Sequence, residues 1–218
     1  MKKPLLKNLW HVFVFAALFV VFAVCLVIAL QTNTAKYGVK IFEGLNESVY
    51  KPVGMFLKIA TNSGNTMSVI MVIAILLAVP NRFFRNNIAL PAGLATLASW
   101  LTNEGVKHLV RRSRPAVESL VTANGYSFPS GHAMNNAALY FTLFFLTYRY
   151  MKKGILKNII LVLLVLIPLI IAFSRVYVGV HYTTDVLAGL SLGMAVAYAT
   201  NLITAHNFKG IENASKNK

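Results

Sequence analysis

The sequence predicts an all-α integral membrane protein: a bundle of six transmembrane helices, with short amphipathic helices after the first span. Of its 218 residues, 57% are hydrophobic and only 12% are charged, whereas soluble domains carry about a quarter charged residues. The charge is also one-sided, with 21 Lys and Arg against 6 Asp and Glu. Such an excess of positive charge is typical of proteins that bind nucleic acid or an anionic membrane surface. Apolar runs long enough to cross a bilayer, without a nucleic-acid-binding motif, favour the membrane.

The first apolar run covers about 12–30 and is long enough to span a bilayer. Lysines precede it, as in a secretory signal, but the run exceeds a usual signal core and no small-residue cleavage site follows. We therefore expect a retained transmembrane helix. The next segment, 31–65, interleaves charged and apolar residues. This pattern predicts short amphipathic helices at the membrane surface, broken near Pro52 and Gly54, with a plain connecting loop as the alternative.

Five further apolar runs complete the expected bundle. They cover about 66–79, 88–106, 133–148, 159–173 and 184–203. The whole chain, 1–218, is expected to form one membrane-embedded domain, with a disordered polar tail over 207–218. Six spans put both termini on one side of the membrane, and that side holds 12 of the Lys and Arg residues against 9 opposite. The positive-inside rule then predicts cytoplasmic termini.

Three polar clusters interrupt the apolar sequence, all on the side opposite the predicted termini. The first follows the third span, where Lys107 and Arg114 lie seven residues apart. A continuing helix would carry both on one face. Arginine offers a planar fork of donors for phosphate oxygens, and lysine offers a compact charge. The alternative is a basic cluster at the membrane edge that binds lipid headgroups.

The second cluster, 127–132, predicts the start of the fourth span. Pro129 favours a first helical turn, Ser130 can supply a capping oxygen, and Gly131 allows a close backbone approach to a ligand. The unpaired N–H groups of a helix start attract phosphate. His132 would stand beside that anion, able to give or take a proton near neutral pH.

The third cluster, 174–185, begins with Ser174-Arg175 and contains His181 and Asp185 four residues apart. At a helix start this spacing puts both side chains on one face. A carboxylate on one ring nitrogen fixes the tautomer and leaves the other nitrogen free to attack. The alternative is a structural hydrogen bond, but ionisable residues at a membrane boundary favour function. The sequence has no His-x-x-His or paired-carboxylate set, so we expect no metal site.

Together the three clusters resemble the signature of the type 2 phosphatidic acid phosphatase (PAP2) superfamily. The resemblance rests on Lys107 through Arg114-Pro115, on Pro129-Ser130-Gly131-His132, and on Ser174-Arg175 through His181 to Asp185. The small size is similar to the bacterial phosphatidylglycerophosphatase B type and the related undecaprenyl pyrophosphate phosphatases. The resemblance implies a hydrolase of lipid phosphate monoesters or diphosphates that needs neither metal nor cofactor.

The resemblance also implies a role for each site residue. His181 would attack phosphorus and become a phosphohistidine, while Asp185 steadies the charge that grows on the ring. His132 would protonate the leaving oxygen and then activate water. The residues implied to bind the phosphate oxygens are Lys107, Arg114, Ser130, Gly131 and Arg175.

We therefore expect a multi-pass protein of the bacterial plasma membrane, with cytoplasmic N- and C-termini and an extracytoplasmic active site. Its partners would be the bilayer and a lipid phosphate, namely undecaprenyl pyrophosphate, phosphatidylglycerol phosphate or phosphatidic acid, with no nucleic acid and no obligate protein partner. Outward-facing chemistry favours recycling of the undecaprenyl carrier. The alternatives are a phosphotransferase that moves phosphate between lipids, or a non-catalytic protein that binds or flips lipid headgroups. Binding alone needs cations but not the two histidines and Asp185, which argues against the last.

Overall fold

The computed structural model describes residues 3–31 and 47–216, with side chains over 9–31 and 53–205. Every regular element within these ranges is a helix, which confirms the all-α prediction for them. The elements are α1 (Lys3–Leu30), α3 (Glu47–Ser63), α4 (Thr66–Ala78), α5 (Arg82–Phe84), the π-helix η2 (Arg85–Ala89), α6 (Leu90–Val110), α7 (Gly131–Tyr150), α8 (Ile155–Tyr177) and α9 (Thr183–Lys216).

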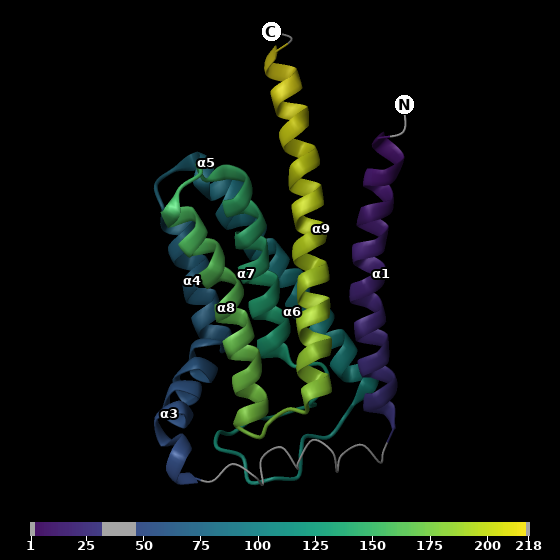
Figure 1. The fold of residues 1–218 in the computed structure, drawn as a ribbon, viewed down its shortest axis with the longest axis vertical. Coiled ribbons are helices and arrows are strands. Elements are labelled where there is room, and N and C mark those ends of the chain that lie inside the picture. Colours follow the sequence, from purple (N-terminus) through teal and green to yellow (C-terminus); the bar gives the residue numbers. More distant parts are fainter. Residues whose placement is uncertain (1–2, 32–46, 217–218) are drawn as a thin grey trace.

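Helix α7 lies at the centre of the bundle, packed against α6, α8 and α9, while α1 packs against α9 (Figure 1). Its buried side chains point in several directions and include small and polar residues such as Ala137, Asn136 and Thr142. A helix shielded by neighbours on most sides need not be uniformly apolar. Helix α7 therefore forms the packing surface that positions α6, α8 and α9.

Helices α7 and α9 approach closely because α9 carries glycine at the contact. A Cβ added to Gly193 would lie 2.3 Å from the backbone oxygen of Met134 and 2.7 Å from Cβ of Ala137. No side chain fits at such a distance, so the two backbones lie nearly in contact, as small residues permit between membrane helices. This contact fixes the relation between the two helices whose first turns carry His132 and Asp185.

Three described helical stretches are long and apolar enough to cross a bilayer: Leu9–Leu30, Ile155–Tyr177 and Thr183–Ala205. A fourth candidate is the pair Val53–Ser63 and Thr66–Ala78, which bend by 61° at their junction. Many large apolar side chains on these helices are exposed, as expected for a surface that faces lipid. The protein is thus a membrane protein with several apolar helices, and the count of six spans stays a prediction.

Helix α3 differs from the sequence prediction, because it runs unbroken from Glu47 to Ser63 and so through Pro52 and Gly54. Gly54 serves a close approach instead: a Cβ there would lie 2.8 Å from the hydroxyl of Tyr177 on α8. The part of the predicted amphipathic segment over 32–46 lies outside the described residues. At the other end of the chain, α9 is helical to Lys216, where the sequence predicts a disordered tail over 207–218.

The start of α1 and the end of α9 lie at one end of the bundle, as six spans predict for the two termini (Figure 1). The loop 111–130, between α6 and α7, and the loop 178–182, between α8 and α9, lie at the opposite end. All three polar clusters of the sequence therefore meet at that end.

Candidate functional site

The carboxylate of Asp185, in the first turn of α9, is fully buried and has four polar neighbours. Oδ1 lies 2.6 Å from Nη1 of Arg112. Oδ2 accepts hydrogen bonds from the hydroxyl of Ser127 and, at 2.9 Å, from the backbone N–H of Tyr182. The same Oδ2 lies 3.5 Å from Nδ1 of His181. A buried carboxylate with this many donors is held in one orientation.

The ring of His181 is only 3% exposed and has different partners on its two nitrogens. Nδ1 faces Asp185 and lies 3.3 Å from the hydroxyl of Ser127. Nε2 lies 3.3 Å from Nη1 of Arg114, which can only donate. These partners favour the neutral tautomer with its proton on Nδ1 and a lone pair on Nε2.

The electrostatic surroundings of His181 also favour the neutral ring. Burial lowers the pKa of His181 from 6.5 to about 4. The hydrogen bond and negative charge of Asp185 oppose this lowering of the pKa, while the positive charges of Arg114 and Arg175 add to it. At neutral pH the imidazole is therefore uncharged, with a lone pair on Nε2.

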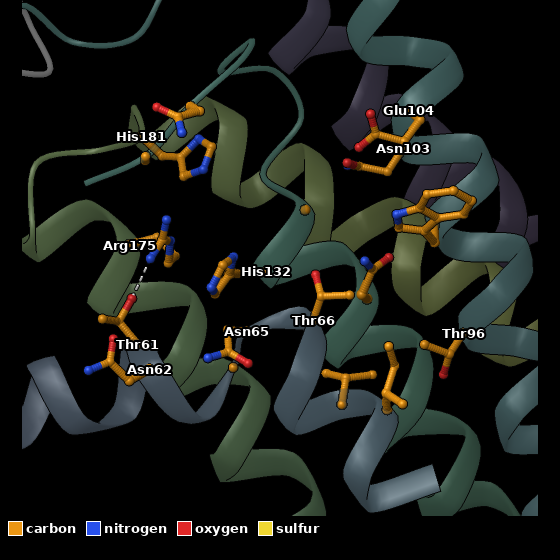
Figure 2. Close-up of a pocket in the computed structure, with 18 of the residues that line it drawn as sticks. Thr61, Asn62, Asn65, Thr66, Thr96, Asn103, Glu104, His132, Arg175 and His181 are labelled. Atoms are coloured by element: carbon orange, nitrogen blue, oxygen red, sulfur yellow. Dashed lines mark hydrogen bonds between the residues drawn. The ribbon is translucent and has the colours of Figure 1, made fainter. Parts of the chain in front are cut away.

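A cavity of about 680 Å³ opens beside His181. His132 from the first turn of α7 and Arg175 from the end of α8 line the same space (Figure 2). Lys107, Arg114 and Gly131 also line it. The structure thus brings both predicted catalytic histidines, the three predicted cations and Gly131 to one cavity.

The start of α7 is built as predicted in outline but not in detail. Ser130 is the N-cap residue of α7, yet its side chain makes no capping hydrogen bond, contrary to the sequence prediction. Its buried Oγ has no hydrogen-bond partner among the described residues. Its backbone N–H instead donates to the carbonyl of Asp185 at 2.9 Å, which joins the starts of α7 and α9. An unpaired buried hydroxyl at a helix start is a group that an anionic ligand would satisfy.

Gly131 allows α6 to lie close to the start of α7. A Cβ at this position would lie 3.0 Å from Oδ1 of Asn103 and 3.6 Å from Nζ of Lys107. The amide of Asn103 also donates to the carbonyl of Pro129 at 3.3 Å. The absence of a side chain at Gly131 therefore keeps Lys107 close to the helix start.

The cations reach the cavity from three different elements. Helix α6 ends at Val110 because Arg111 adopts a left-handed conformation with φ of 50°. Lys107 thus lies in the last turn of α6, paired with Glu104 at 3.0 Å, and Arg114 lies in the loop. The prediction that a continuing helix places both on one face is wrong, although both line the cavity.

Arg114 and Arg175 differ in how their donors are used. The guanidinium of Arg114 donates to the backbone carbonyls of Asn124, Gly125 and Val180 as well as approaching His181. Arg175 donates from Nη1 to the hydroxyl of Thr61 at 2.6 Å, and its buried Nε has no partner among the described residues. Arg175 therefore keeps a donor available beside the cavity.

Sequence reasoning missed three residues of this arrangement: Arg112, Ser127 and Thr61. The first two stand inside the quoted clusters, but nothing in the sequence distinguishes their contacts from those of their neighbours. Thr61 comes from α3, far from the clusters in the chain, and reaches the site because α3 packs against α8. Only a prediction of this helix contact would have identified it.

Beyond the charged end, the cavity runs between α4 and α6. Its walls there include Val69, Ile70 and Ile73 from α4, and Leu97 and Trp100 from α6. Asn62, Asn65 and Thr66 line it at the junction of α3 and α4 (Figure 2). One space therefore joins a cationic end with two histidines to an apolar passage.

Fold and site together define a helical membrane protein with a histidine-containing, cationic cavity at one end of its bundle. Residues 88–209 match the model of the PAP2 superfamily, and the chain belongs to that superfamily. The matched segment begins in η2 and ends in α9, so it includes all three polar clusters and excludes α1, α3 and α4.

Named relatives and a solved structure agree with this family. The chain is 37% identical over 99 residues to phosphatidylglycerophosphatase B of Bacillus subtilis, covering 45% of this chain and 49% of that protein. It is 33% identical over 121 residues to the putative undecaprenyl-diphosphatase YbjG of Escherichia coli, covering 53% and 54%. The chain thus spans about half the length of these curated relatives. A crystal structure of a transmembrane PAP2 type phosphatidylglycerolphosphate phosphatase from Bacillus subtilis superposes with a TM-score of 0.67 and 26% identity, over 94% of this chain and 98% of that one.

Proposed function

We propose that the protein is a lipid phosphatase that removes the terminal phosphate of a lipid phosphate or diphosphate. The observation that carries the proposal is the setting of His181. Its Nδ1 faces a buried carboxylate, its Nε2 faces a cationic cavity, and a second histidine lines that cavity. A neutral imidazole oriented in this way is the arrangement that an attack on phosphorus requires.

In the proposed reaction, Nε2 of His181 forms a bond to phosphorus while the bond from phosphorus to the lipid oxygen breaks. His132 gives its proton to that leaving oxygen. In the second step a water attacks phosphorus, His132 takes a proton from the water, and the N–P bond breaks to release inorganic phosphate. Asp185 stabilises the positive charge that the ring of His181 carries between the two steps.

The cations would stabilise the phosphoryl group through both steps. Lys107, Arg114 and Arg175 line the cavity and would supply positive charge, and the amide of Gly131 would supply a hydrogen bond. Ser130 does not line the cavity, so its unpaired Oγ would have to turn toward the phosphate to add another. Charge in phosphoryl transfer is spread over the equatorial oxygens, where such donors act most strongly. For Arg114 this role requires an exchange of partners, because its donors are already occupied by protein atoms.

The apolar passage between α4 and α6 supports a lipid as the substrate. A tail placed between Ile70, Ile73 and Leu97 would leave its phosphate at the charged end. The relatives are named for phosphatidylglycerol phosphate and undecaprenyl diphosphate, so we propose these two lipids as substrates to test first.

We also propose that six helices span the bilayer, with α6 and α7 as the spans whose polar residues face the protein interior. Buried Asn103 on α6 and Asn136 on α7 lower the apolarity of these helices without facing lipid. The termini would then be cytoplasmic and the cavity extracytoplasmic, in a bacterial plasma membrane.

Two alternative functions, a phosphotransferase and a headgroup-binding protein, predict a different outcome for the bound phosphate. A phosphotransferase would pass phosphate from His181 to a second lipid, and a headgroup-binding protein would make no product. Full purification in detergent, followed by measurement of inorganic phosphate released from each candidate lipid, separates the three. We expect release of phosphate in water without an acceptor lipid.

The nucleophile is tested in the same assay. His181→Ala should abolish phosphate release, and brief incubation of wild-type enzyme with labelled substrate should leave acid-labile, base-stable label on the protein. His108→Ala is the matched control, because His108 is an exposed histidine in the last turn of α6 that does not line the cavity. Phosphate release by His181→Ala would end the assignment.

A further inference from the structure

Apart from the hydrogen bond from the hydroxyl of Ser127, the contact of Arg112 is the shortest polar contact that the carboxylate of Asp185 makes. Its Nη1 lies 2.6 Å from Oδ1 of Asp185 and donates at 2.8 Å to the hydroxyl of Thr184. The guanidinium carbon also lies 4.0 Å from the ring centre of Tyr182. The side chain is 9% exposed, so this is a nearly dry ion pair rather than a surface one.

Arg112 and Arg114 lie two residues apart but perform different tasks. Arg114 lines the cavity and approaches Nε2 of His181, on the side where a phosphate would bind. Arg112 does not line the cavity and lies on the far side of Asp185. The backbone N–H of Ser127 donates to the carbonyl of Arg112 at 2.9 Å, so the loop closes on itself here. Arg112 is therefore placed to act on the carboxylate and not on the substrate.

The division of contacts on Asp185 suggests what that action is. Arg112 takes Oδ1, which leaves Oδ2 to face Ser127, the N–H of Tyr182 and Nδ1 of His181. A fully buried carboxylate without a cation tends to take up a proton or to turn toward another donor. Either change would remove the acceptor that holds the proton of His181 on Nδ1.

We propose that Arg112 is a positioning residue: it keeps Asp185 ionised and oriented, and through Asp185 it holds His181 in the tautomer whose Nε2 can attack. The proposal rests on the proposed function for its kinetic consequence. Its structural part, the control of the His181 tautomer, does not depend on which reaction the protein catalyses.

The kinetic test compares Arg112→Gln and Arg112→Lys with the wild type. Misplacing a catalytic group by about 1 Å can cost ~100-fold in rate, so we expect Arg112→Gln to lower kcat by about that factor. KM should change by less than about threefold, because Arg112 does not reach the cavity, and Arg112→Lys should restore part of kcat. Arg111→Gln is the control, since Arg111 is an exposed neighbour and its substitution removes the same charge from the same cluster. Wild-type kcat in Arg112→Gln, or an effect confined to KM, would overturn the proposal.

A double-mutant cycle tests whether Arg112 acts through Asp185. Asp185→Asn removes the carboxylate charge, so Arg112→Gln should have little further effect on kcat in that background. Independent, multiplicative losses of kcat would overturn the proposal. Arg112→Gln alone leaves the buried charge of Asp185 unpaired, so this variant should melt at a lower temperature than the double variant. If Arg112→Gln folds poorly, the comparison of the double variant with Asp185→Asn still measures the effect of Arg112.

Nitrogen NMR of labelled histidine gives a readout that needs no turnover. The groups whose charges act on the ring are Asp185 from α9, Arg114 from the loop and Arg175 from α8, with His132 of α7 in the same cavity. We expect the wild-type spectrum to show His181 protonated on Nδ1 alone, and Arg112→Gln to show a mixture of tautomers. An unchanged tautomer would overturn the proposal. If the wild type released no phosphate from any lipid, the proposed function would fail, and this measurement would still decide on Arg112.

Discussion

The hydroxyl of Thr61 on α3 accepts a hydrogen bond of 2.6 Å from Nη1 of Arg175 on α8. Thr61 is buried, and it lies outside the segment 88–209 that matches the superfamily. The candidate site of this chain is therefore completed by α3, a helix that lies outside the segment that matches the superfamily.

Thr61→Val should impair the enzyme because the isosteric side chain leaves the guanidinium of Arg175 without this acceptor. A hydrogen bond to a charged group contributes about 1.5–3 kcal/mol, so we expect kcat/KM to fall by about 10- to 160-fold. Thr61→Ser, which keeps the hydroxyl, should stay near wild type. Steady-state release of phosphate measures both variants, and equal activity of Val and Ser would contradict a role for the hydroxyl.

The pH profile should follow the protonation of His181. Because its pKa in the folded protein is lowered to about 4, the reactive neutral ring persists down to mildly acidic pH. We expect the acid limb of the kcat/KM profile to be centred near pH 4 rather than near 6.5. A fall at high pH, where the proton donor to the leaving oxygen is lost, should instead appear in kcat, which reports the groups of the enzyme–substrate complex, and it should make the profile of turnover bell-shaped. An acid limb centred at 6.5 would show that His181 titrates as an exposed histidine.

The same shift makes a prediction for stability. The unfolded chain protonates His181 at its ordinary pKa of 6.5, whereas the folded chain resists until about 4. Between these values the unfolded state binds more protons, so the free energy of unfolding should fall as pH is lowered from 6.5 to 4. Melting temperatures across this range should depend less on pH in His181→Asn than in the wild type. An identical pH dependence in the two proteins would contradict the shift.

Close packing of α7 on α9 predicts that Gly193→Ala is damaging. The added Cβ meets the backbone of Met134, which cannot turn aside as a side chain can. Overpacking of this kind costs about 1–3 kcal/mol, and it would also move α9 away from α7 and so lower activity. Gly105→Ala is the matched control, because nothing lies within 4 Å of its added Cβ and alanine favours a helix by about 1 kcal/mol. Thermal melting and phosphate release check both variants.

Activity should survive a strong chelator. The charged groups that line the cavity are the carboxylate of Glu104 and the cations Lys107, Arg114 and Arg175. The three cations attract phosphate oxygens directly and repel a divalent metal ion. Within the described residues Asp185 is held by Arg112, and Glu104 by Lys107, so neither carboxylate is left to bind such an ion. Loss of phosphate release on dialysis against chelator, restored by a divalent metal, would contradict this prediction.

Much of the fold was predictable because apolar runs of sufficient length have few alternatives in a membrane. The runs over 133–148 and 159–173 became α7 and α8 with a few residues added at each end. The added residues include polar and basic side chains such as His132, Lys157 and Arg175, so a search for uninterrupted apolar runs ends before the helices do. The end of α6 could not be predicted either. Helices commonly end at a glycine or asparagine in the left-handed conformation, but here the left-handed residue is Arg111.

The site was predictable only as far as its residue types carry distinctive chemistry. Histidine four residues before aspartate is a recognisable pair, and the structure places His181 and Asp185 together. A run of several arginines gives no such signal: Arg112 and Arg114 are chemically identical, and only the path of the loop decides which one meets the carboxylate. The neutral hydroxyls of Ser127 and Thr61 are too common in sequence to be recognised before folding.

Hydrogen bonds from Arg114 also hold the loop 121–126 against the site. The guanidinium of Arg114 donates hydrogen bonds to the carbonyls of Asn124 and Gly125. A phosphate bound by the same N–H groups would compete with these carbonyls, so we expect binding of the headgroup to release this loop. The backbone amides of the segment would then report substrate occupancy through their hydrogen–deuterium exchange, even in a variant that cannot turn over.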